Sequence, residues 1–191
     1  MPLAMTLLLD DAAAVPIRAM WRALAEGGVD DDCLRLGYPP HLTLAVWPEE
    51  APVGPLAAAV ERFGAEWDAM PVALAGFGVF PGAPAVLWAA PVVTGALLAR
   101  HAALVAAVPD TPCHPHYQPG RWMPHVTLGQ TDAPGRGLEV LAPLWREARP
   151  GRLDRLELVR FRPVSVLRSL PFGCPATLGR APRERGDVKA P

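Results

Sequence analysis

One short segment occurs twice in this sequence, and both copies combine an imidazole with a hydroxyl. PHLTL at residues 40–44 recurs as PHVTL at residues 124–128, 84 positions later. A run rich in strand-forming residues begins at the histidine of each copy, which predicts two strands. Side chains at positions i and i+2 of a strand point to the same face. The histidine and threonine of each copy are therefore expected to project together, and the apolar residues between them to enter a core.

An imidazole and a hydroxyl on each side of a cleft would suit displacement at phosphorus. Histidine titrates near neutral pH, so one of His41 and His125 could deprotonate the attacking group while the other protonates the leaving oxygen. Thr43 and Thr127 can donate hydrogen bonds to the phosphoryl oxygens. This chemistry requires the two halves of the chain to pack with their motifs facing each other. A duplicated structural element that keeps the motif without catalysis is the alternative.

Aromatic and cationic residues near the two motifs are candidates for substrate binding. Trp47 is six residues after His41 and is expected on the same face of the strand. Tyr117, Arg121 and Trp122 lie in the loop before the second motif. Aromatic rings can stack on a base and arginine can pair with a phosphate. The alternatives are a core role for the aromatic residues and a solvated surface position for the arginine.

The cysteines and remaining histidines do not indicate a metal site. The chain has three cysteines and no CxxC pair, which favours reduced thiols in a cytoplasmic protein. Cys113, His114 and His116 could ligate a metal, but three ligands within four residues do not close a four-ligand site, and no fourth is evident. We therefore expect neither a metal nor a cofactor.

Composition indicates an ordinary globular protein. The chain has 191 residues, of which 51% are hydrophobic and 19% charged, and its formal net charge is −1. This balance excludes a polycationic nucleic-acid binder, so we expect no DNA partner. Residues 69–99 carry no charge and could span a membrane, but four prolines and four glycines interrupt them. A strand hairpin fits better, and we expect no membrane partner.

Periodicity predicts alternating strands and helices, typical of an α+β protein. We expect one domain over residues 1–180 and a charged, flexible tail over 181–191. The acidic residues 30–32 are expected in a solvated loop. The predicted strands are residues 5–10, 41–47, 72–80, 85–92, 125–129, 153–163 and 165–170. The predicted helices are residues 12–25, 53–67, 94–108 and 138–147, and the predicted long loops are residues 29–40 and 109–122.

The paired PHLTL and PHVTL motifs resemble those of the 2H phosphoesterase superfamily, especially its bacterial 2′-5′ RNA ligase-like branch. The resemblance implies a bilobal, pseudo-twofold α+β fold, with two antiparallel sheets facing a central cleft and helices packed outside. By position, His41 and His125 match the catalytic histidines of that family. Thr43 and Thr127 match its phosphate-binding hydroxyls.

The activity implied by this resemblance is metal-independent hydrolysis of a 2′,3′-cyclic phosphate by two-histidine acid/base catalysis. The substrate would be an RNA end or a small cyclic nucleotide, and some family members also join RNA ends through 2′-5′ linkages. The alternative is a non-catalytic module that binds an RNA end or a nucleotide in the same cleft. We expect a monomer.

Overall fold

The computed structural model describes residues 1–145 and 147–173, in which antiparallel strands and helices alternate. This is the α+β class expected from the sequence. The strands are β1 (Leu3–Leu9), β2 (His41–Trp47), β3 (Met70–Phe80), β4 (Ala85–Pro91), β5 (Val126–Thr131), β6 (Arg149–Arg160) and β7 (Ser165–Pro171). The helices are α1 (Asp11–Glu26), α2 (Asp32–Leu36), α3 (Val53–Glu66), α4 (Gly95–Ala106) and α5 (Pro134–Leu141), with short 3₁₀ turns η1 (Pro115–Tyr117) and η2 (Ala142–Leu144).

All of these strands belong to one hydrogen-bonded sheet, where two sheets were expected. Its order is β2-β1-β6-β3-β4-β5, and β7 also pairs with β6. The long strand β6 joins the two halves. It pairs with β1 along one edge, while the other edge pairs with β3 through its first residues and with β7 through its last. The expectation of two separate sheets is wrong because β6 is long enough to serve both.

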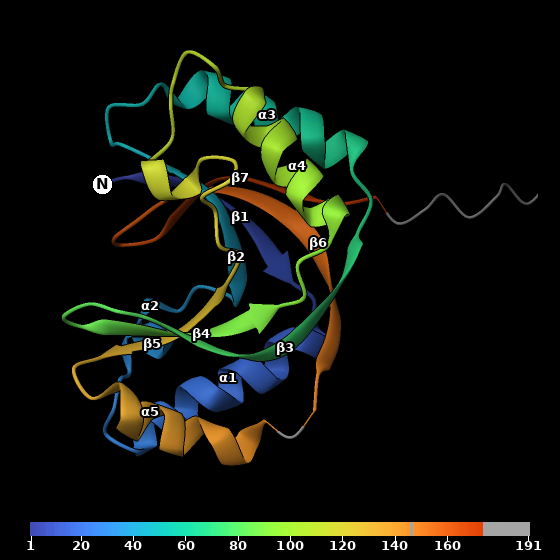
Figure 1. Cartoon of the computed structure of the whole chain (residues 1–191). Coiled ribbons are helices and arrows are strands. Elements are labelled where there is room, and N and C mark those ends of the chain that lie inside the picture. Colours follow the sequence, from blue (N-terminus) through green and yellow to red (C-terminus); the bar gives the residue numbers. More distant parts are fainter. Residues whose placement is uncertain (146, 174–191) are drawn as a thin grey trace, which may run out of the picture.

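The two strands that carry the repeated motif are the two ends of this sheet. The sheet is curved, so that β2 and β5 approach each other although four strands separate them in the hydrogen-bonding order. Helices α3 and α4 lie at one end of the molecule, and α1 and α5 at the other (Figure 1). The curvature therefore brings together two motifs that are far apart in the sequence.

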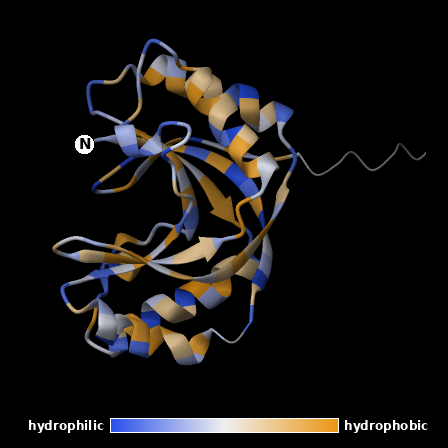
Figure 2. Ribbon diagram, in the orientation of Figure 1, coloured by the Kyte–Doolittle hydropathy of each residue, from blue (hydrophilic) through white to orange (hydrophobic). Residues whose placement is uncertain are grey.

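A continuous apolar core fills the space between the sheet and the helices. Strand β1 is buried along its whole length, and Figure 2 colours it as strongly hydrophobic. Helix α1 packs one face inward through residues such as Ile17 and Leu24, which follow the helical period. The side chain of Asp10 accepts a hydrogen bond from the Ala13 amide and caps its first turn. Ile17→Ala should lower the free energy of unfolding by about 2–5 kcal/mol.

The predicted strands and the hairpin at residues 72–92 are confirmed, and the differences lie in short or loop-like segments. Residues 32–36 form helix α2 where a loop was expected, and Gly37 ends it with a left-handed φ of 65°. Helix α5 begins at Pro134, earlier than predicted, and ends at Leu141. The tail at 181–191 lies outside the described residues. None of the described helices is long and apolar enough to cross a membrane.

Candidate functional site

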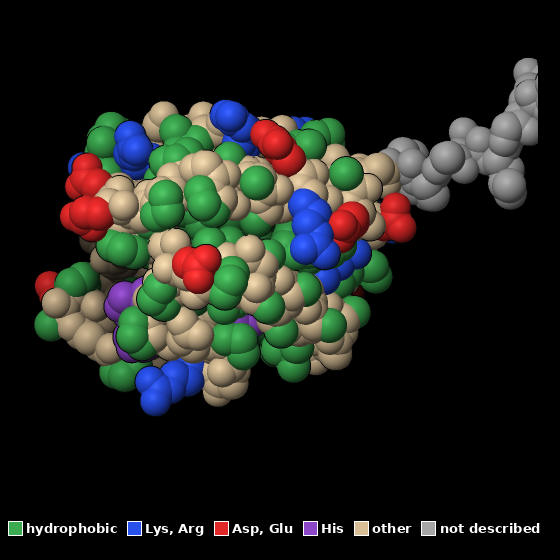
Figure 3. All heavy atoms as spheres, turned by 90° about the horizontal axis from the view of Figure 1, so that it is seen from above, with side chains coloured by type: hydrophobic (Ala, Val, Ile, Leu, Met, Phe, Trp, Pro, Cys, Tyr) green, Lys and Arg blue, Asp and Glu red, His purple; other side chains and the backbone are tan. Residues whose placement is uncertain are grey.

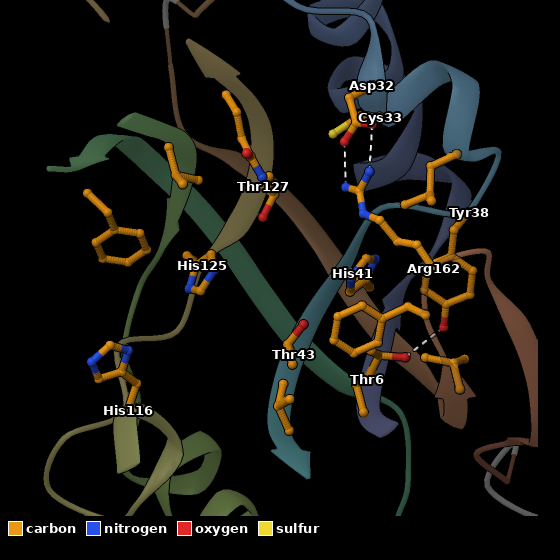
Figure 4. A pocket seen from close by; sticks show the side chains of 18 of the residues that line it. Thr6, Asp32, Cys33, Tyr38, His41, Thr43, His116, His125, Thr127 and Arg162 are labelled. Carbon is orange, nitrogen blue, oxygen red and sulfur yellow. Dashed lines mark hydrogen bonds and ion pairs between the residues drawn. The ribbon is translucent and has the colours of Figure 1, made fainter. Parts of the chain in front are cut away.

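A cavity of about 700 Å³ opens between the two ends of the sheet. Figure 3 shows histidine side chains at a recess of the surface, and Figure 4 shows the cavity from close by. His41 and Thr43 line it from β2, His125 lines it from the position just before β5, and Thr127 lines it from β5 itself. The structure thus brings the four residues of the two motifs into one cavity.

A β-bulge interrupts both strands at the same position of the motif. In the pairing of β1 with β2, Leu44 is the extra residue between Thr43 and Ala45. In the pairing of β4 with β5, Leu128 is the extra residue between Thr127 and Gly129. A bulge bends a strand and reverses its alternation of faces. The repeat therefore includes a backbone irregularity as well as the side chains.

The same hydrogen bond orients each imidazole. His41 Nδ1 lies 2.7 Å from the carbonyl oxygen of Pro39, and His125 Nδ1 lies 2.8 Å from that of Met123. Because a carbonyl can only accept, Nδ1–H is the donor in both cases. This fixes the tautomer and leaves Nε2 of each ring as the atom that can exchange a proton with a ligand. Both rings line the cavity, from opposite sides (Figure 4).

Both histidines hold a proton less readily than a free imidazole. Burial lowers the pKa of His41 and of His125, and in each case the bond to the backbone carbonyl opposes that effect. At His41 the pKa is lowered further by the charge of His125 and raised by the carboxylate of Glu157. A bound phosphate would favour the charged imidazolium at both positions.

Two indoles hold the backbone of the two threonines. Trp122 Nε1 donates to the carbonyl oxygen of Thr43, and Trp21 Nε1 donates to that of Thr127, each at 3.0 Å. Trp122 was predicted to contact substrate, and it does line the cavity, but it is only 8% exposed and stacks on His101 at 4.1 Å between ring centroids. Its contacts support a role in positioning Thr43.

Trp47 lies outside the cavity, contrary to the expectation that it binds substrate. Simple alternation from His41 would place it on the cavity face, but the bulge at Leu44 reverses the alternation and turns Val46 to that face instead. Trp47 is 1% exposed, and its indole N–H donates to the Thr111 carbonyl oxygen at 2.8 Å. It is a core residue.

The loop before β5 supplies the other predicted contacts. Tyr117 and Arg121 both line the cavity, Tyr117 half-buried and Arg121 exposed. The three residues considered as metal ligands are differently placed, because Cys113 is buried, His114 is exposed and His116 lines the cavity. Within residues 1–145 and 147–173, no group of three His, Cys, Asp or Glu side chains is arranged to hold a metal ion.

An acidic segment spans one end of the cavity, where a solvated loop was expected. Asp30 accepts a hydrogen bond from the Gln130 amide at 3.0 Å, next to the second motif. Asp32 forms a bidentate pair with Arg162, at 2.6 and 2.5 Å, in the turn after β6 (Figure 4). The hydrogen bond from Arg162 lowers the pKa of the Asp32 carboxyl. Residues 30–32 thus link both sides of the site.

The surroundings of the two histidines differ. The ring of Tyr38 lies edge-on to His41, with 4.8 Å between ring centroids. The ring of Phe80 lies edge-on to His125 at 4.9 Å and stacks on Trp88. Sequence reasoning missed these neighbours, because none belongs to the repeat and none has a spacing that places it there.

Comparison with known proteins identifies the family and the fold. A family model described as the 2′-5′ RNA ligase superfamily matches residues 9–163. No curated protein matches the chain. Among solved structures, TT0787 of Thermus thermophilus is 20% identical, with a TM-score of 0.62 over 90% of this chain and 98% of that one.

Two further solved structures share the fold. LigT of E. coli, solved with 3′-AMP, is 16% identical, with a TM-score of 0.57 over 90% of this chain and 99% of that one. Usb1 of Kluyveromyces marxianus is 18% identical, with a TM-score of 0.51 over 90% of this chain and 98% of that one. A family match over most of the chain and a fold shared along nearly its whole length lead to one conclusion: the chain belongs to the 2′-5′ RNA ligase superfamily, a branch of the 2H phosphoesterases.

Proposed function

We propose that this protein hydrolyses 2′,3′-cyclic phosphates without a metal, using His41 and His125 as an acid/base pair. One observation carries the proposal. The two imidazoles line a single cavity from opposite ends of the sheet, and a backbone carbonyl fixes Nδ1 of each, so that both Nε2 atoms are free for proton transfer. Thr43 and Thr127 are the proposed donors to the phosphoryl oxygens.

In this reaction the oxygen of a water molecule bonds to phosphorus while the bond from phosphorus to one ribose oxygen breaks. The proton of the water passes to the neutral imidazole, and the protonated imidazole gives its proton to the departing ribose oxygen. The product is a 2′- or 3′-phosphomonoester. If the 5′-hydroxyl of another RNA end replaces water, and the 3′ oxygen departs, the same exchange forms a 2′-5′ linkage. The near-equivalence of the motifs leaves the acid and the base unassigned.

The proposed substrate is an RNA end or a small cyclic nucleotide. A cavity of about 700 Å³ lies within the usual range for sites of small ligands. LigT has been solved with 3′-AMP and with NADP+, and Usb1 with uridine monophosphate. Arg121 is the proposed phosphate contact and Tyr117 the proposed stacking residue. A monomer in the cytoplasm, without a DNA or membrane partner, remains our prediction.

A non-catalytic module that binds nucleotides or RNA ends is the second candidate. The lowered pKa of both histidines favours it in one respect, because two neutral imidazoles would leave the reaction without a protonated acid for the leaving oxygen. Such a module would use the same cavity and the same arginine. Binding without turnover is the behaviour that separates it from the enzyme.

Turnover of a 2′,3′-cyclic mononucleotide by the purified protein tests the proposal. We expect conversion to the phosphomonoester, followed by chromatography, and the same rate in the presence of EDTA. Glu61→Gln, in an exposed ion pair with Arg168, serves as a control variant with unchanged turnover. Binding of the product nucleotide with no conversion would favour the module. Loss of turnover in EDTA, restored by a divalent ion, would contradict the metal-independent mechanism.

A further inference from the structure

A network of hydrogen bonds, buried at Thr6 and Tyr38 and reaching the surface at Ser169, runs behind His41. Tyr38, whose ring packs edge-on against His41, donates from its hydroxyl to Glu157 Oε2 at 2.8 Å. The same hydroxyl lies 2.7 Å from Thr6 Oγ1, which therefore donates to it. The other carboxyl oxygen of Glu157 accepts from Ser169 Oγ at 2.6 Å. Thr6 is also the cross-strand partner of Thr43, so these hydrogen bonds end beside one of the two proposed phosphate contacts.

Glu157 is a buried carboxylate without a cationic partner among the described residues. Its side chain belongs to a residue that is 6% exposed, and both of its oxygens accept hydrogen bonds from hydroxyls. An ionised carboxylate can only accept hydrogen bonds, and both oxygens of Glu157 have a hydroxyl in position to donate. A buried charge held only by neutral donors is costly for the fold.

The second half of the site has no equivalent among the described residues. Thr43 pairs with Thr6 on the neighbouring strand, and Thr6 pairs in turn with Glu157. At the other end of the sheet, Thr127 pairs with Trp88, and Trp88 pairs in turn with Gly78. A side chain at Gly78 would collide with the indole of Trp88, which lies across that position. His125 therefore packs against aromatic rings, whereas His41 packs against Tyr38, whose hydroxyl is hydrogen-bonded to the carboxylate of Glu157.

We propose that Tyr38 and Glu157 are positioning residues that hold the ring of His41 and favour its protonated form, and that His125 lacks such support. The proposal rests on the function proposed above, in which both histidines transfer protons. Tyr38 supplies the packing, and Glu157 supplies a negative charge on the wall behind the imidazole. The two histidines are then alike in sequence and different in their response to pH.

Few charged groups face His41 from the elements around it. His125 faces it from the position just before β5, Glu157 lies behind it on β6, and Tyr38 packs against it from the segment before β2. Burial raises the pKa of Tyr38, which keeps its hydroxyl protonated as a donor. Asp32 and Arg162 line the same cavity but form an ion pair with each other. The remaining cationic or titratable side chains of the cavity are those of Asp30, Cys33, His116, Tyr117 and Arg121.

Titration of both histidines by NMR in the free protein tests this proposal without relying on turnover. Glu157→Gln removes the charge and keeps the shape, so we expect the pKa of His41 to fall and that of His125 to stay. Glu157→Asp keeps the charge and is the matched variant, with the pKa of His41 close to that of the wild type. Glu61→Gln makes the same chemical change in an exposed ion pair and should move neither histidine.

Kinetics give an independent measurement. Tyr38→Phe keeps the ring against His41, but the Glu157 carboxylate loses one of its two hydrogen-bond donors. Its ionised form is therefore less stable. We expect kcat to fall about tenfold, less than the roughly 10²–10⁴-fold loss for a proton-transfer group, with KM unchanged. One limb of the pH–rate profile should move to lower pH while the other stays. Tyr38→Phe therefore tests the proposal even if the Glu157→Gln variant does not fold.

The outcomes separate this proposal from the proposed function. If the pKa of His41 is the same in Glu157→Gln as in the wild type, or if both histidines shift equally, Tyr38 and Glu157 do not have the role proposed here. If His41 shifts as expected but the wild-type protein does not convert cyclic nucleotides, the positioning is upheld and the proposed reaction fails.

Discussion

The two halves of the site share their local machinery. In each half a bulge follows directly after the threonine of the motif, at Leu44 and at Leu128. In each half Nδ1 of the histidine binds the carbonyl two residues earlier, and an indole binds the carbonyl of the threonine. These shared features involve the backbone. The repeat therefore specifies where each imidazole lies and which nitrogen faces the cavity.

What lies behind each imidazole differs. Tyr38 and Glu157 support His41, whereas Phe80 and Trp88 surround His125. Neither set of neighbours lies within a motif, and both come from strands or loops that pack against it. A repeated sequence can thus place two chemically identical groups symmetrically, while their surroundings give them different electrostatics.

The largest expected effect tests what the two halves have in common. His41→Ala and His125→Ala should each lower kcat by roughly 10²–10⁴-fold, the usual contribution of one proton-transfer group. The double variant should lose much less than the product of the two single losses, because the groups act as a unit. Steady-state rates with a 2′,3′-cyclic nucleotide measure all three.

The pH dependence belongs to the same measurement. Since one histidine must be neutral and the other protonated, kcat should follow a bell in pH, whose two apparent pKa values belong to the pair. A His41→Ala variant with full activity would exclude the two-histidine mechanism, whatever the similarity of the motifs.

Sequence reasoning identified the features that depend on local patterns. Strand alternation and the repeat were enough to predict that the four motif residues share one site, and the structure brings them to one cavity. The hairpin at residues 72–92 followed from its prolines and glycines. Local signals of this kind survive because the residues that make them are neighbours in the chain.

The missed features depend on contacts between distant residues. Trp21 reaches Thr127 across 106 positions, Tyr38 reaches Glu157 across 119, and Arg162 reaches Asp32 across 130. No periodicity in a single sequence encodes such pairs. The error at Trp47 has another origin, because one inserted residue in a strand reverses every later side chain, and nothing in the residue types of the motif marks the bulge.

An intermediate effect tests the two indoles. Trp21→Phe and Trp122→Phe keep an aromatic ring but remove the N–H that binds the backbone of Thr127 or Thr43. Each should lower the free energy of unfolding by at least about 1 kcal/mol, the net value of a typical hydrogen bond, because the smaller ring also leaves a space in the core. Because the affected carbonyl belongs to a proposed phosphate contact, kcat should also fall several-fold in each.

Trp47→Phe is the matched control for that pair. It removes an indole hydrogen bond of similar length, to Thr111, which does not line the cavity. Chemical denaturation should give a similar loss of stability for all three variants, whereas only Trp21→Phe and Trp122→Phe should affect kcat. Equal kinetic losses in all three would mean that the indoles act through stability alone.

The smallest expected effect concerns Asp32, which joins residues 30–32 to the half that contains His41. Its ion pair with Arg162 is partly exposed, so Asp32→Asn should cost about 1 kcal/mol or less at neutral pH. The pKa of Asp32 is lowered in the folded protein, chiefly by the hydrogen bond from Arg162. The stabilisation is therefore complete above the ordinary aspartate pKa of about 4 and is lost as the pH falls through the lowered value.

Denaturation of wild type and variant between neutral and acidic pH measures this contribution. The difference in the free energy of unfolding between wild type and variant should be constant from about pH 7 down to about 4. It should shrink below that pH, because protonation of Asp32 then removes the ion pair that the variant lacks at every pH. Asp31→Asn is the control, since Asp31 pairs with Arg35, four residues further along the chain, on the surface. A difference that grows as the pH falls would contradict the assignment of this pair as the link between residues 30–32 and the turn after β6.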